Sequence, residues 1–275
     1  MRTIAGDLTK DTTLCLSLSG RPGNTGTRFH NYLYDALGLD YVYKAFTTTD
    51  IVAAIAGVRG LGIRGAAISM PWKEDVIPLV DELDPSAEAI ESVNTIVNTD
   101  GRLVAYNTDY IAIATLLRDN EIDRSSSVAV LGSGGMAKAT VAALRDGGYA
   151  DVTVVARNAS SGGALAERYG FDRVAELGDA RPQVVINCTP VGMAGGPQAD
   201  ALPVADEVVT AADVVFDVVP MPEITPLLAR AAELGKVTIT GASVMSLQAL
   251  EQFVLYTGVR PSPELAAEAT AYSRA

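Results

Sequence analysis

Short apolar runs alternate with amphipathic stretches along most of this chain. Thr13–Ser19 has the length and composition of a buried strand, and Phe29–Leu37 has the apolar spacing of a helix. Between them, Gly20-Arg-Pro-Gly-Asn contains the residues that interrupt regular structure. The chain is therefore predicted to begin with a strand, a loop and a helix.

The same alternation continues to about residue 117. The predicted elements are a strand over Tyr41–Phe46, an Ala- and Ile-rich helix capped by Asp50, a strand over Ile63–Ser69, a hairpin of Val93–Val97 and Leu103–Ala105 around Asp100-Gly101, and a helix over Tyr110–Leu117. Strands that alternate with helices usually pair in parallel, so we expect the three strands before the hairpin to pair in parallel. We place the crossing into a second domain at Asn107-Thr108-Asp109.

From Val128 onward the strand-then-helix repeat becomes regular. The predicted elements are the strands Val128–Leu131, Val152–Ala156, Val184–Asn187, Val214–Asp217 and Val237–Thr240, and the helix Met136–Arg145. Such a repeat is typical of a doubly wound parallel sheet. We expect the helix Met245–Tyr256 and a shorter one after Pro261 to return to the first domain. The prediction is an α/β protein whose first domain comprises residues 1–108 and 245–275, with a Rossmann-type domain over residues 109–244.

Composition and charge narrow the classes of protein. The 275 residues carry a formal net charge of -12 without a local run of Lys and Arg, which argues against nucleic-acid binding. No stretch approaches the ~20 apolar residues of a membrane span, and Met1–Leu14 lacks the apolar core of a signal peptide. Cys15 and Cys188 lie far apart and His30 is the single histidine, so no metal site is expected. We expect a cytoplasmic protein, monomeric or homodimeric, that binds a small molecule.

The first strand of the regular repeat leads directly into a glycine-rich turn. The segment Gly132-Ser-Gly134-Gly135-Met136-Ala137 has the Gly-x-Gly-x-x-Ala pattern between a strand and a helix. The glycines permit a tight turn and close approach of a pyrophosphate, which the N–H groups at the helix start can bind. An ordinary glycine-rich turn is the alternative, and the strand-to-helix context disfavours it.

An arginine follows the second strand of this domain. Sites that prefer NAD usually carry an acidic residue there for the ribose hydroxyls, whereas this chain has Arg157. The forked guanidinium suits the adenosine 2′-phosphate of NADP. Ser160 and Ser161 can serve the same phosphate or cap a helix, and a solvated surface arginine is the alternative. The pattern favours NADP as the cofactor.

Six motifs, taken in order along the chain, resemble those of shikimate dehydrogenases. They are Ser69-Met-Pro71-Trp-Lys73, Ser92-Val-Asn94-Thr95, Tyr106-Asn107-Thr108-Asp109, Gly132-Ser-Gly134-Gly135, Asn187-Cys-Thr189-Pro-Val-Gly192-Met193 and Gln248-Ala249. The resemblance spans nearly the whole chain and is greatest to the divergent shikimate dehydrogenase-like branch. It implies the family's two-domain fold and the NADP-dependent oxidation of shikimate to 3-dehydroshikimate.

The resemblance also implies a role for each matching side chain. Lys73 follows a buried-looking strand, at the edge where open α/β sheets bind ligands, and would relay the proton of the reacting hydroxyl. Asp109 would hydrogen-bond the same region, whereas His30 lies in an apolar helix where packing or capping is expected. The implied substrate-binding residues are Thr25, Thr27, Ser69, Asn94 and Gln248. The implied or predicted cofactor-binding residues are Gly132, Gly134, Gly135, Met136, Ala137, Arg157, Asn187, Thr189, Met193, Val218 and Gly241.

Several positions depart from the family's pattern. A shorter segment with Thr25 and Thr27 replaces the Ser-x-Ser-Pro that precedes the family's His-Asn pair, Tyr110 follows Asp109 in place of Gly, and Pro220 replaces a substrate-contacting Tyr. One missing hydrogen bond typically costs ~1–3 kcal/mol, or roughly 10- to 100-fold in efficiency. Dehydrogenation of quinate or a related cyclic hydroxy acid therefore stays open, as does an NADP-binding regulatory protein with vestigial activity.

Overall fold

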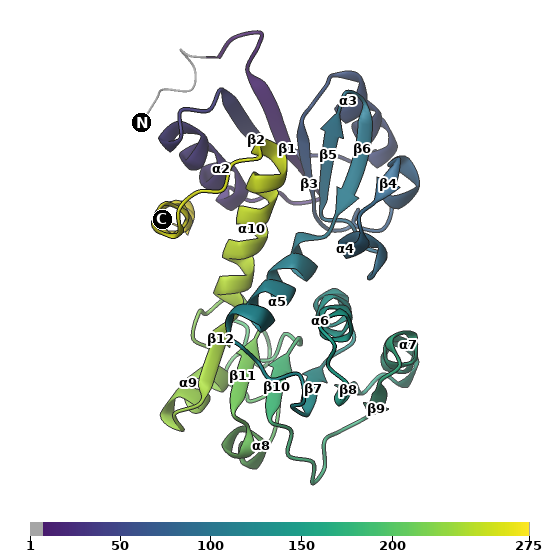
Figure 1. Cartoon of the computed structure of the whole chain (residues 1–275), viewed down its shortest axis with the longest axis vertical. Coiled ribbons are helices and arrows are strands. Elements are labelled where there is room, and N and C mark those ends of the chain that lie inside the picture. The colour runs from purple at the N-terminus through teal and green to yellow at the C-terminus, as the bar shows by residue number, and fades with distance from the viewer. Residues whose placement is uncertain (1–7, 275) are drawn as a thin grey trace. The chain divides into compact units, whose positions relative to one another are not determined.

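The chain forms two compact units. The computed structural model describes residues 8–274, so residues 1–7 of the segment considered above for a signal peptide lie outside the described residues. One unit comprises residues 1–108 and 246–275, and the other comprises residues 109–245. The predicted α/β class is confirmed, and Figure 1 labels most of the elements of each unit.

The first unit is built on a six-stranded sheet. Its elements are β1 (Thr13–Ser19), α2 (Thr25–Ala36), β2 (Tyr41–Thr47), α3 (Ile51–Gly60), β3 (Gly65–Ile68), the 3-10 helix η1 (Ile77–Leu79), β4 (Glu82–Leu83), α4 (Pro85–Glu88), β5 (Thr95–Thr99), β6 (Arg102–Tyr106), most of α10 (Gly241–Thr257), and α11 (Pro263–Arg274). The strand order is β2-β1-β3-β5-β6-β4.

The first sheet is mixed, because it combines the three strands predicted to pair in parallel with the predicted hairpin. β1 pairs in parallel with β2 and β3, but β5 is antiparallel to both β3 and β6. The predicted hairpin reverses the chain at Asp100 and Gly101, whose φ angles are 53° and 88°. Two successive residues with positive φ are the signature of a type I′ hairpin turn. A two-residue turn of this kind enforces antiparallel pairing.

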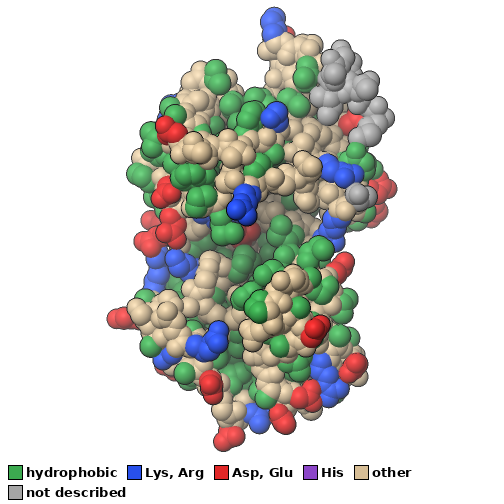
Figure 2. Space-filling view, turned by 180° about the vertical axis from the view of Figure 1, so that it is seen from behind, with side chains coloured by type: hydrophobic (Ala, Val, Ile, Leu, Met, Phe, Trp, Pro, Cys, Tyr) green, Lys and Arg blue, Asp and Glu red, His purple; other side chains and the backbone are tan. Residues whose placement is uncertain are grey.

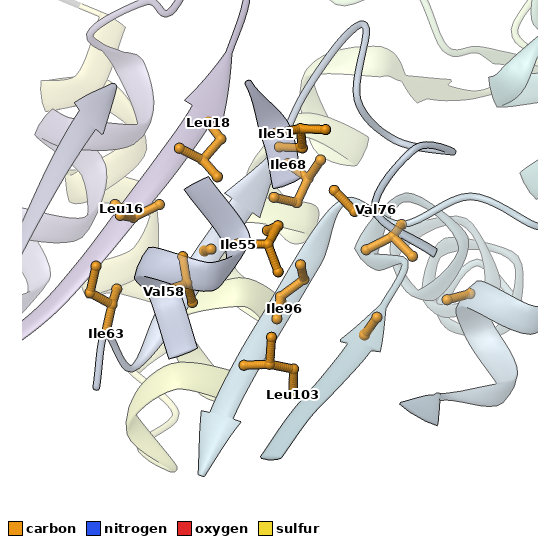
Figure 3. Packing of buried hydrophobic residues seen from close by; sticks show 14 residues of the cluster. Leu16, Leu18, Ile51, Ile55, Val58, Ile63, Ile68, Val76, Ile96 and Leu103 are labelled. Atoms are coloured by element: carbon orange, nitrogen blue, oxygen red, sulfur yellow. The ribbon is translucent and has the colours of Figure 1, made fainter. Parts of the chain in front are cut away.

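One face of the first sheet packs against α3. Leu16 and Leu18 alternate along β1 and therefore point to the same face. Ile51, Ile55 and Val58 recur at helical spacing on α3 and meet that face (Figure 3). These side chains are nearly or completely buried. The cluster forms the hydrophobic core on which β3, the strand that precedes Lys73, is held.

The aromatic residues of the other face surround His30. Its imidazole is fully buried and stacks on the ring of Tyr43 with 4.4 Å between ring centroids. Tyr34, Phe253 and Tyr256 lie around it with centroids 5.8 to 6.2 Å away. The packing role expected for His30 is therefore confirmed. The same contacts hold α10 against α2 and β2.

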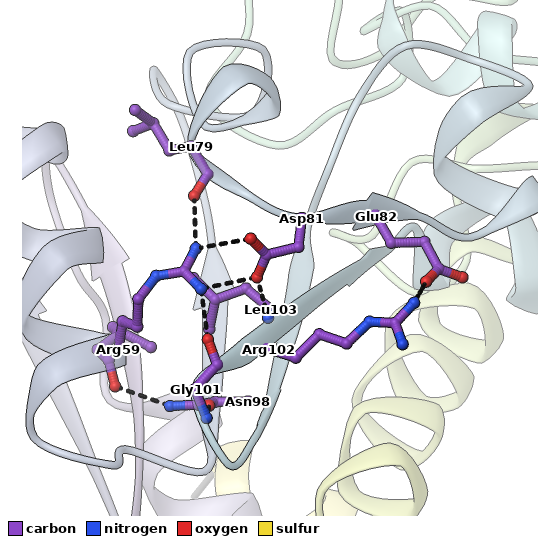
Figure 4. A network of polar contacts seen from close by, with 9 residues as sticks. Arg59, Leu79, Asp81, Glu82, Asn98, Gly101, Arg102 and Leu103 are labelled. Carbon is purple, nitrogen blue, oxygen red and sulfur yellow. Dashed lines mark hydrogen bonds and ion pairs between the residues drawn. The ribbon is translucent and has the colours of Figure 1, made fainter.

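A polar network connects α3 with β4 and the β5–β6 hairpin (Figure 4). Arg59 donates to the Asp81 carboxylate at 2.7 Å and to the carbonyl of Gly101. Asp81 also accepts the N–H of Leu103 at 2.7 Å. The adjacent Arg59 guanidinium lowers the pKa of the Asp81 carboxyl, with the Leu103 N–H acting in the same direction. The segment between β3 and β4 contains Lys73, and the network holds the end of this segment at Asp81.

The second unit has the predicted Rossmann-type architecture. Its elements are α5 (Thr108–Asp119), β7 (Val128–Leu131), α6 (Gly135–Asp146), β8 (Val152–Val155), α7 (Ala159–Tyr169), β9 (Asp172–Val174), β10 (Val184–Asn187), α8 (Asp206–Ala211), β11 (Val214–Asp217), α9 (Pro226–Glu233) and β12 (Val237–Thr240). All strand pairs are parallel, in the order β12-β11-β10-β7-β8-β9. Four predicted strands have the observed bounds and the fifth, β8, ends one residue earlier.

The surface carries charges of both signs. On the face drawn in Figure 2, Lys and Arg side chains are interspersed with Asp and Glu side chains. Among residues 8–274, no helix has both the length and the apolar character needed to cross a membrane. Cys15 and Cys188 are both free thiols, and burial raises the pKa of each to about 12.

Candidate active site and cofactor site

Lys73 lies in a turn that directly follows β3, as the sequence predicted. Within this turn, the N–H of Trp72 donates to the carbonyl of Ser69 at 3.0 Å, and the N–H of Val93 donates to the carbonyl of Lys73 at 2.8 Å. Trp72 also packs against the core cluster of Figure 3. The backbone of Lys73 is therefore held at the carboxyl end of β3, which is the edge where open α/β sheets bind ligands.

The carboxamide of Asn94 has a fixed orientation beside this turn. Its Oδ1 accepts the N–H and the hydroxyl of Thr108 at 2.8 and 3.1 Å, and the hydroxyl of Thr95 at 2.9 Å. Its Nδ2 is buried and has no hydrogen-bond partner among residues 8–274. An unpaired buried donor typically costs ~1–3 kcal/mol. The structure thus presents an amide donor that a ligand oxygen would satisfy.

Helix α10 adds two further amide side chains near Asn94. The hydroxyl of Thr108 approaches Oε1 of Gln248 at 3.4 Å, and Nε2 of Gln252 donates to the backbone carbonyl of Asn94 at 3.3 Å. Asn94 and Gln248 were predicted from the sequence, but Thr108 and Gln252 were not assigned roles. Gln252 follows Gln248 by four residues and therefore shares its helix face, a signal that was available in the sequence.

The structure gives Thr25, Thr27 and Ser69 different surroundings. Ser69 is exposed directly after β3, next to the Lys73 turn. Thr25 is exposed at the start of α2, which begins four residues before the predicted helix start at Phe29. Thr27 lines a cavity of about 480 Å³, and neither Asn94 nor Gln248 lines it. The substrate contacts of these three hydroxyl groups stay predictions.

The glycine-rich turn of the second unit has open space for a ligand beside the uncapped start of α6. Gly134 is the N-cap of α6, and no side chain caps the helix there. A Cβ at Gly134 or Gly135 would meet no atom within 4 Å. Gly132 has φ of 112°, and a Cβ there would lie 3.2 Å from the carbonyl oxygen of Cys188. The first N–H groups of α6 are therefore accessible to a phosphate, as the motif predicts.

The side chain of Asn187 is engaged by its own loop and by the end of β11. Its Nδ2 donates to Asp217 at 3.0 Å and to the carbonyl of Val191 at 3.2 Å, while its Oδ1 accepts the hydroxyl of Thr189 at 2.6 Å. Asp217 is fully buried, and this burial raises the pKa of its carboxyl although Thr225 donates to it at 2.6 Å. Asn187 and Thr189 thus shape the loop after β10, and their contacts to a cofactor stay predictions.

The remaining predicted cofactor residues lie around the ends of the parallel strands or the start of α6. Gly241 begins α10, and a Cβ there would lie 2.5 Å from the carbonyl oxygen of Val218 after β11. Met193 is partly buried in the loop after β10. Met136 and Ala137 form the first turn of α6, with Ala137 fully buried and Met136 partly exposed. Glycine is required at position 241 because any side chain would strike the neighbouring backbone.

Arg157 is exposed immediately after β8, in the position expected for recognition of a 2′-phosphate. Asn158 caps α7 by accepting the N–H groups of Ser160 and Ser161 at 3.0 and 3.1 Å. The alternative in which one of the two serines caps this helix is therefore wrong. The hydroxyl of Ser161 instead lies 2.8 Å from that of Ser133 in the glycine-rich turn.

These features define a class of protein. An α/β unit with a lysine and amide donors at a sheet edge is joined to a unit with a Rossmann-type nucleotide site, as in two-domain nicotinamide-nucleotide dehydrogenases. A family model of the shikimate dehydrogenase substrate binding domain matches residues 25–96. The chain belongs to the shikimate dehydrogenase family, as the resemblance of its motifs implied.

Individual relatives cover almost the whole chain. A shikimate dehydrogenase-like protein of Haemophilus influenzae is 54% identical over 97% of this chain and 98% of its own length. The solved structure of a shikimate 5-dehydrogenase-like protein has a TM-score of 0.97 and 53% identity, covering 98% of this chain and 100% of its own. The expected place in the shikimate dehydrogenase-like branch is confirmed.

A more distant relative was solved with both ligands. Shikimate 5-dehydrogenase of Thermus thermophilus, in complex with NADP(H) and shikimate, has a TM-score of 0.83 and 29% identity, covering 95% of this chain and 100% of its own. The structural similarity over 95% of this chain shows that the two proteins share the two-domain architecture.

Proposed function

We propose that this protein is an NADP-dependent dehydrogenase that reversibly oxidises shikimate to 3-dehydroshikimate. The observation that carries the proposal is the buried, unpaired Nδ2 of Asn94 beside the turn of Lys73. An oxygen of a ligand would satisfy this donor, and a cyclic polyhydroxy acid supplies several. The relative solved with NADP(H) and shikimate supports this pairing of cofactor and substrate.

The groups that bind the substrate are hydroxyl, amide and ammonium groups. Asn94 donates from Nδ2 to a substrate hydroxyl, and Gln248 binds a second hydroxyl from α10. Ser69, Thr25 and Thr27 complete the set of substrate-binding residues. Because the Oδ1 of Asn94 is already occupied by three donors, this amide acts toward the substrate only as a donor. The hydroxyl that Asn94 binds therefore keeps its own proton for a hydrogen bond to another acceptor.

Oxidation of the reacting hydroxyl, which Lys73 binds, removes a hydride from carbon and a proton from oxygen. Nicotinamide, when bound, supplies the hydride acceptor. Lys73 receives the hydroxyl proton through Nζ and relays it to solvent, and Asp109 hydrogen-bonds the same hydroxyl region. Asp109 directly follows Thr108, so the hydrogen bonds of Thr108 to Asn94 also constrain where the chain enters α5. In the reverse direction Lys73 returns the proton to the carbonyl oxygen.

The residues of the second unit fit an NADP molecule. The uncapped start of α6 provides N–H groups for the pyrophosphate, and the absence of side chains at Gly134 and Gly135 leaves the approach open. Arg157 binds the 2′-phosphate through its guanidinium. Gly132 and Gly241 allow the close backbone contacts that shape the site. The other proposed cofactor-binding residues are Met136, Ala137, Asn187, Thr189, Met193 and Val218.

The turnover of shikimate is expected to be inefficient. Pro220 stands where the family places a Tyr that contacts the substrate, and proline has no side-chain donor. A lost hydrogen bond of ~1–3 kcal/mol corresponds to roughly 10- to 100-fold in kcat/KM.

The test is an absorbance assay of NADPH with purified protein and either shikimate or quinate, with NAD run in parallel. We expect NADP-dependent turnover of shikimate, and a fall in kcat of about 10²- to 10⁴-fold in Lys73→Ala, because proton relay is lost. Lys10→Ala is the matched control, since that side chain is 88% exposed and pairs with the adjacent Asp11. Unchanged turnover in Lys73→Ala, or preference for quinate, would contradict the proposal.

A further inference from the structure

A second arginine binds the backbone at the point where β8 ends. Arg173 lies on β9, the edge strand that pairs with β8. Its Nε and Nη2 donate to the carbonyl of Ala156 at 3.1 and 2.6 Å, and its Nη2 also donates to the carbonyl of Arg157 at 3.4 Å. One guanidinium therefore bridges two successive carbonyl groups, and the second of them belongs to the residue that we assign to the 2′-phosphate.

The start of α7 is packed tightly against the same point. A Cβ at Gly162 would lie 2.5 Å from the Cβ of Ala156 and 3.6 Å from the Cγ of Arg173. Gly162 is buried, and Asn158 caps the helix just before it. The backbone of Arg157 is thus held by the Arg173 guanidinium on one side and by the capped start of α7 on the other.

The chemistry of the expected ligand calls for more than one cation. A phosphate monoester carries roughly -1.5 to -2 charges at neutral pH, which one guanidinium does not neutralise. Arg173 places a second positive charge at the same turn as Arg157, and the paired hydroxyls of Ser133 and Ser161 add neutral polar groups. A forked guanidinium can bind carbonyl oxygens in two directions at once, whereas a lysine ammonium lacks this planar fork.

We propose that Arg173 is a specificity-determining residue for the 2′-phosphate of NADP, which positions the backbone of Arg157 and adds a second positive charge beside it. This inference depends on the proposed function, because it requires NADP as the cofactor. Selection of NADP over NAD would then be divided between two arginines, one on β9 and one in the turn that follows β8. Arg173→Met removes both contributions, and Arg173→Lys keeps the charge but not the two-carbonyl bridge.

The experiment measures binding of adenosine 2′,5′-bisphosphate and of adenosine 5′-monophosphate by calorimetry, with the full chain. We expect Arg173→Met to weaken binding of the bisphosphate about 10-fold and Arg173→Lys about 3-fold, the scale of lost charge-assisted hydrogen bonds. Binding of the monophosphate should change by less than about 2-fold. Arg181→Met is the matched control, because Arg181 also donates to backbone carbonyls, those of Gly178 and Ala180, in the same unit.

The outcomes separate the role of Arg173 from the cofactor assignment. A purely structural role would weaken the binding of both nucleotides in parallel, and that result would overturn the inference. The inference would also be overturned if Arg173→Met kept the full preference of the native protein for the bisphosphate. If the native protein itself shows no such preference, the NADP assignment fails, and this inference fails with it. Thermal unfolding of both Arg173 variants checks that they fold. If Arg173→Met does not fold, the binding of the two nucleotides is compared between the native protein and Arg173→Lys.

Discussion

At the scale of single residues, the orientation of one amide decides what the substrate unit can recognise. An isolated Asn can present either its oxygen or its amino group to a ligand. In Asn94 the oxygen is occupied by Thr95 and Thr108, so the amino group is the end that remains. Thr108 lies within a motif of the family, but its part in orienting Asn94 depends on a contact between residues 14 positions apart.

We expect Thr108→Val to raise the KM for shikimate about 5- to 10-fold with a smaller change in kcat. Valine keeps the shape of threonine and the backbone N–H but removes the hydroxyl, so the carboxamide of Asn94 loses one of the donors that orient it. Steady-state kinetics at saturating NADP checks this. Thr108→Ser, which retains the hydroxyl, should restore KM, and failure of this rescue would argue against the orienting role.

The second prediction at this scale concerns acid stability. Burial lowers the pKa of His30 from 6.5 to about 3, with the nearby Gln252 side chain acting in the opposite direction. In the unfolded chain the imidazole takes up a proton near pH 6.5, so between pH 6.5 and 3 the unfolded state binds more protons than the folded one. The contribution of His30 is complete above pH 6.5 and decreases as the pH falls toward 3.

Urea unfolding at pH 7.5 and pH 4.5 measures this effect. From this group alone, the free energy of unfolding should fall by about 2–3 kcal/mol between the two conditions. His30→Phe, which can keep the aromatic stack on Tyr43, should show a smaller fall. Since carboxyl groups titrate in both proteins, the comparison between them isolates the imidazole. Equal losses in the two proteins would show that His30 does not govern acid stability.

At the scale of elements, the strands followed the hydrophobic pattern more closely than the helices did. Strand bounds such as Val128–Leu131 coincide with runs of fully buried residues, and burial is what the apolar pattern reports. Helix starts were displaced: α2 begins at Thr25 and α10 at Gly241, each four residues before the predicted start. Helix ends are set by backbone geometry and local contacts, and polar or glycine residues at the first turn carry no apolar signal.

A prediction at this scale concerns the packing of α10 on β3. A Cβ at Gly65 would lie 2.3 Å from the Cδ1 atom of Tyr256. We expect Gly65→Ala to lower the free energy of unfolding by about 1–3 kcal/mol, because overpacking displaces the aromatic ring. Gly57→Ala on α3 is the control, since nothing lies within 4 Å of its added Cβ and alanine favours helix. Thermal unfolding that ranks the two variants equally would refute a tight contact at Gly65.

At the scale of the whole molecule, the second unit is an insertion into the first. The chain leaves the first unit after Thr108 and returns to it at Ser246. Residues close to these two crossings, Thr108 and Gln248, are both part of the first unit and approach each other at 3.4 Å. The hydrogen bonds around Asn94 therefore combine segments that lie far apart in the sequence, while the proposed cofactor residues belong to the inserted unit.

The sequence alone determined the fold class, the family, the glycine-rich turn and the position of Lys73 after a buried strand. These features are local in the chain: periodic apolar residues indicate burial, and closely spaced glycines between a strand and a helix indicate a tight turn. Tertiary structure decided the rest. The antiparallel pairing of β5 with β3, the saturated oxygen of Asn94, the hydrogen bond from Asn187 to Asp217 and the bridge from Arg173 to Arg157 all depend on which segments become neighbours. A hydrogen bond between distant segments leaves no periodic trace in either, so only the folded chain reveals it.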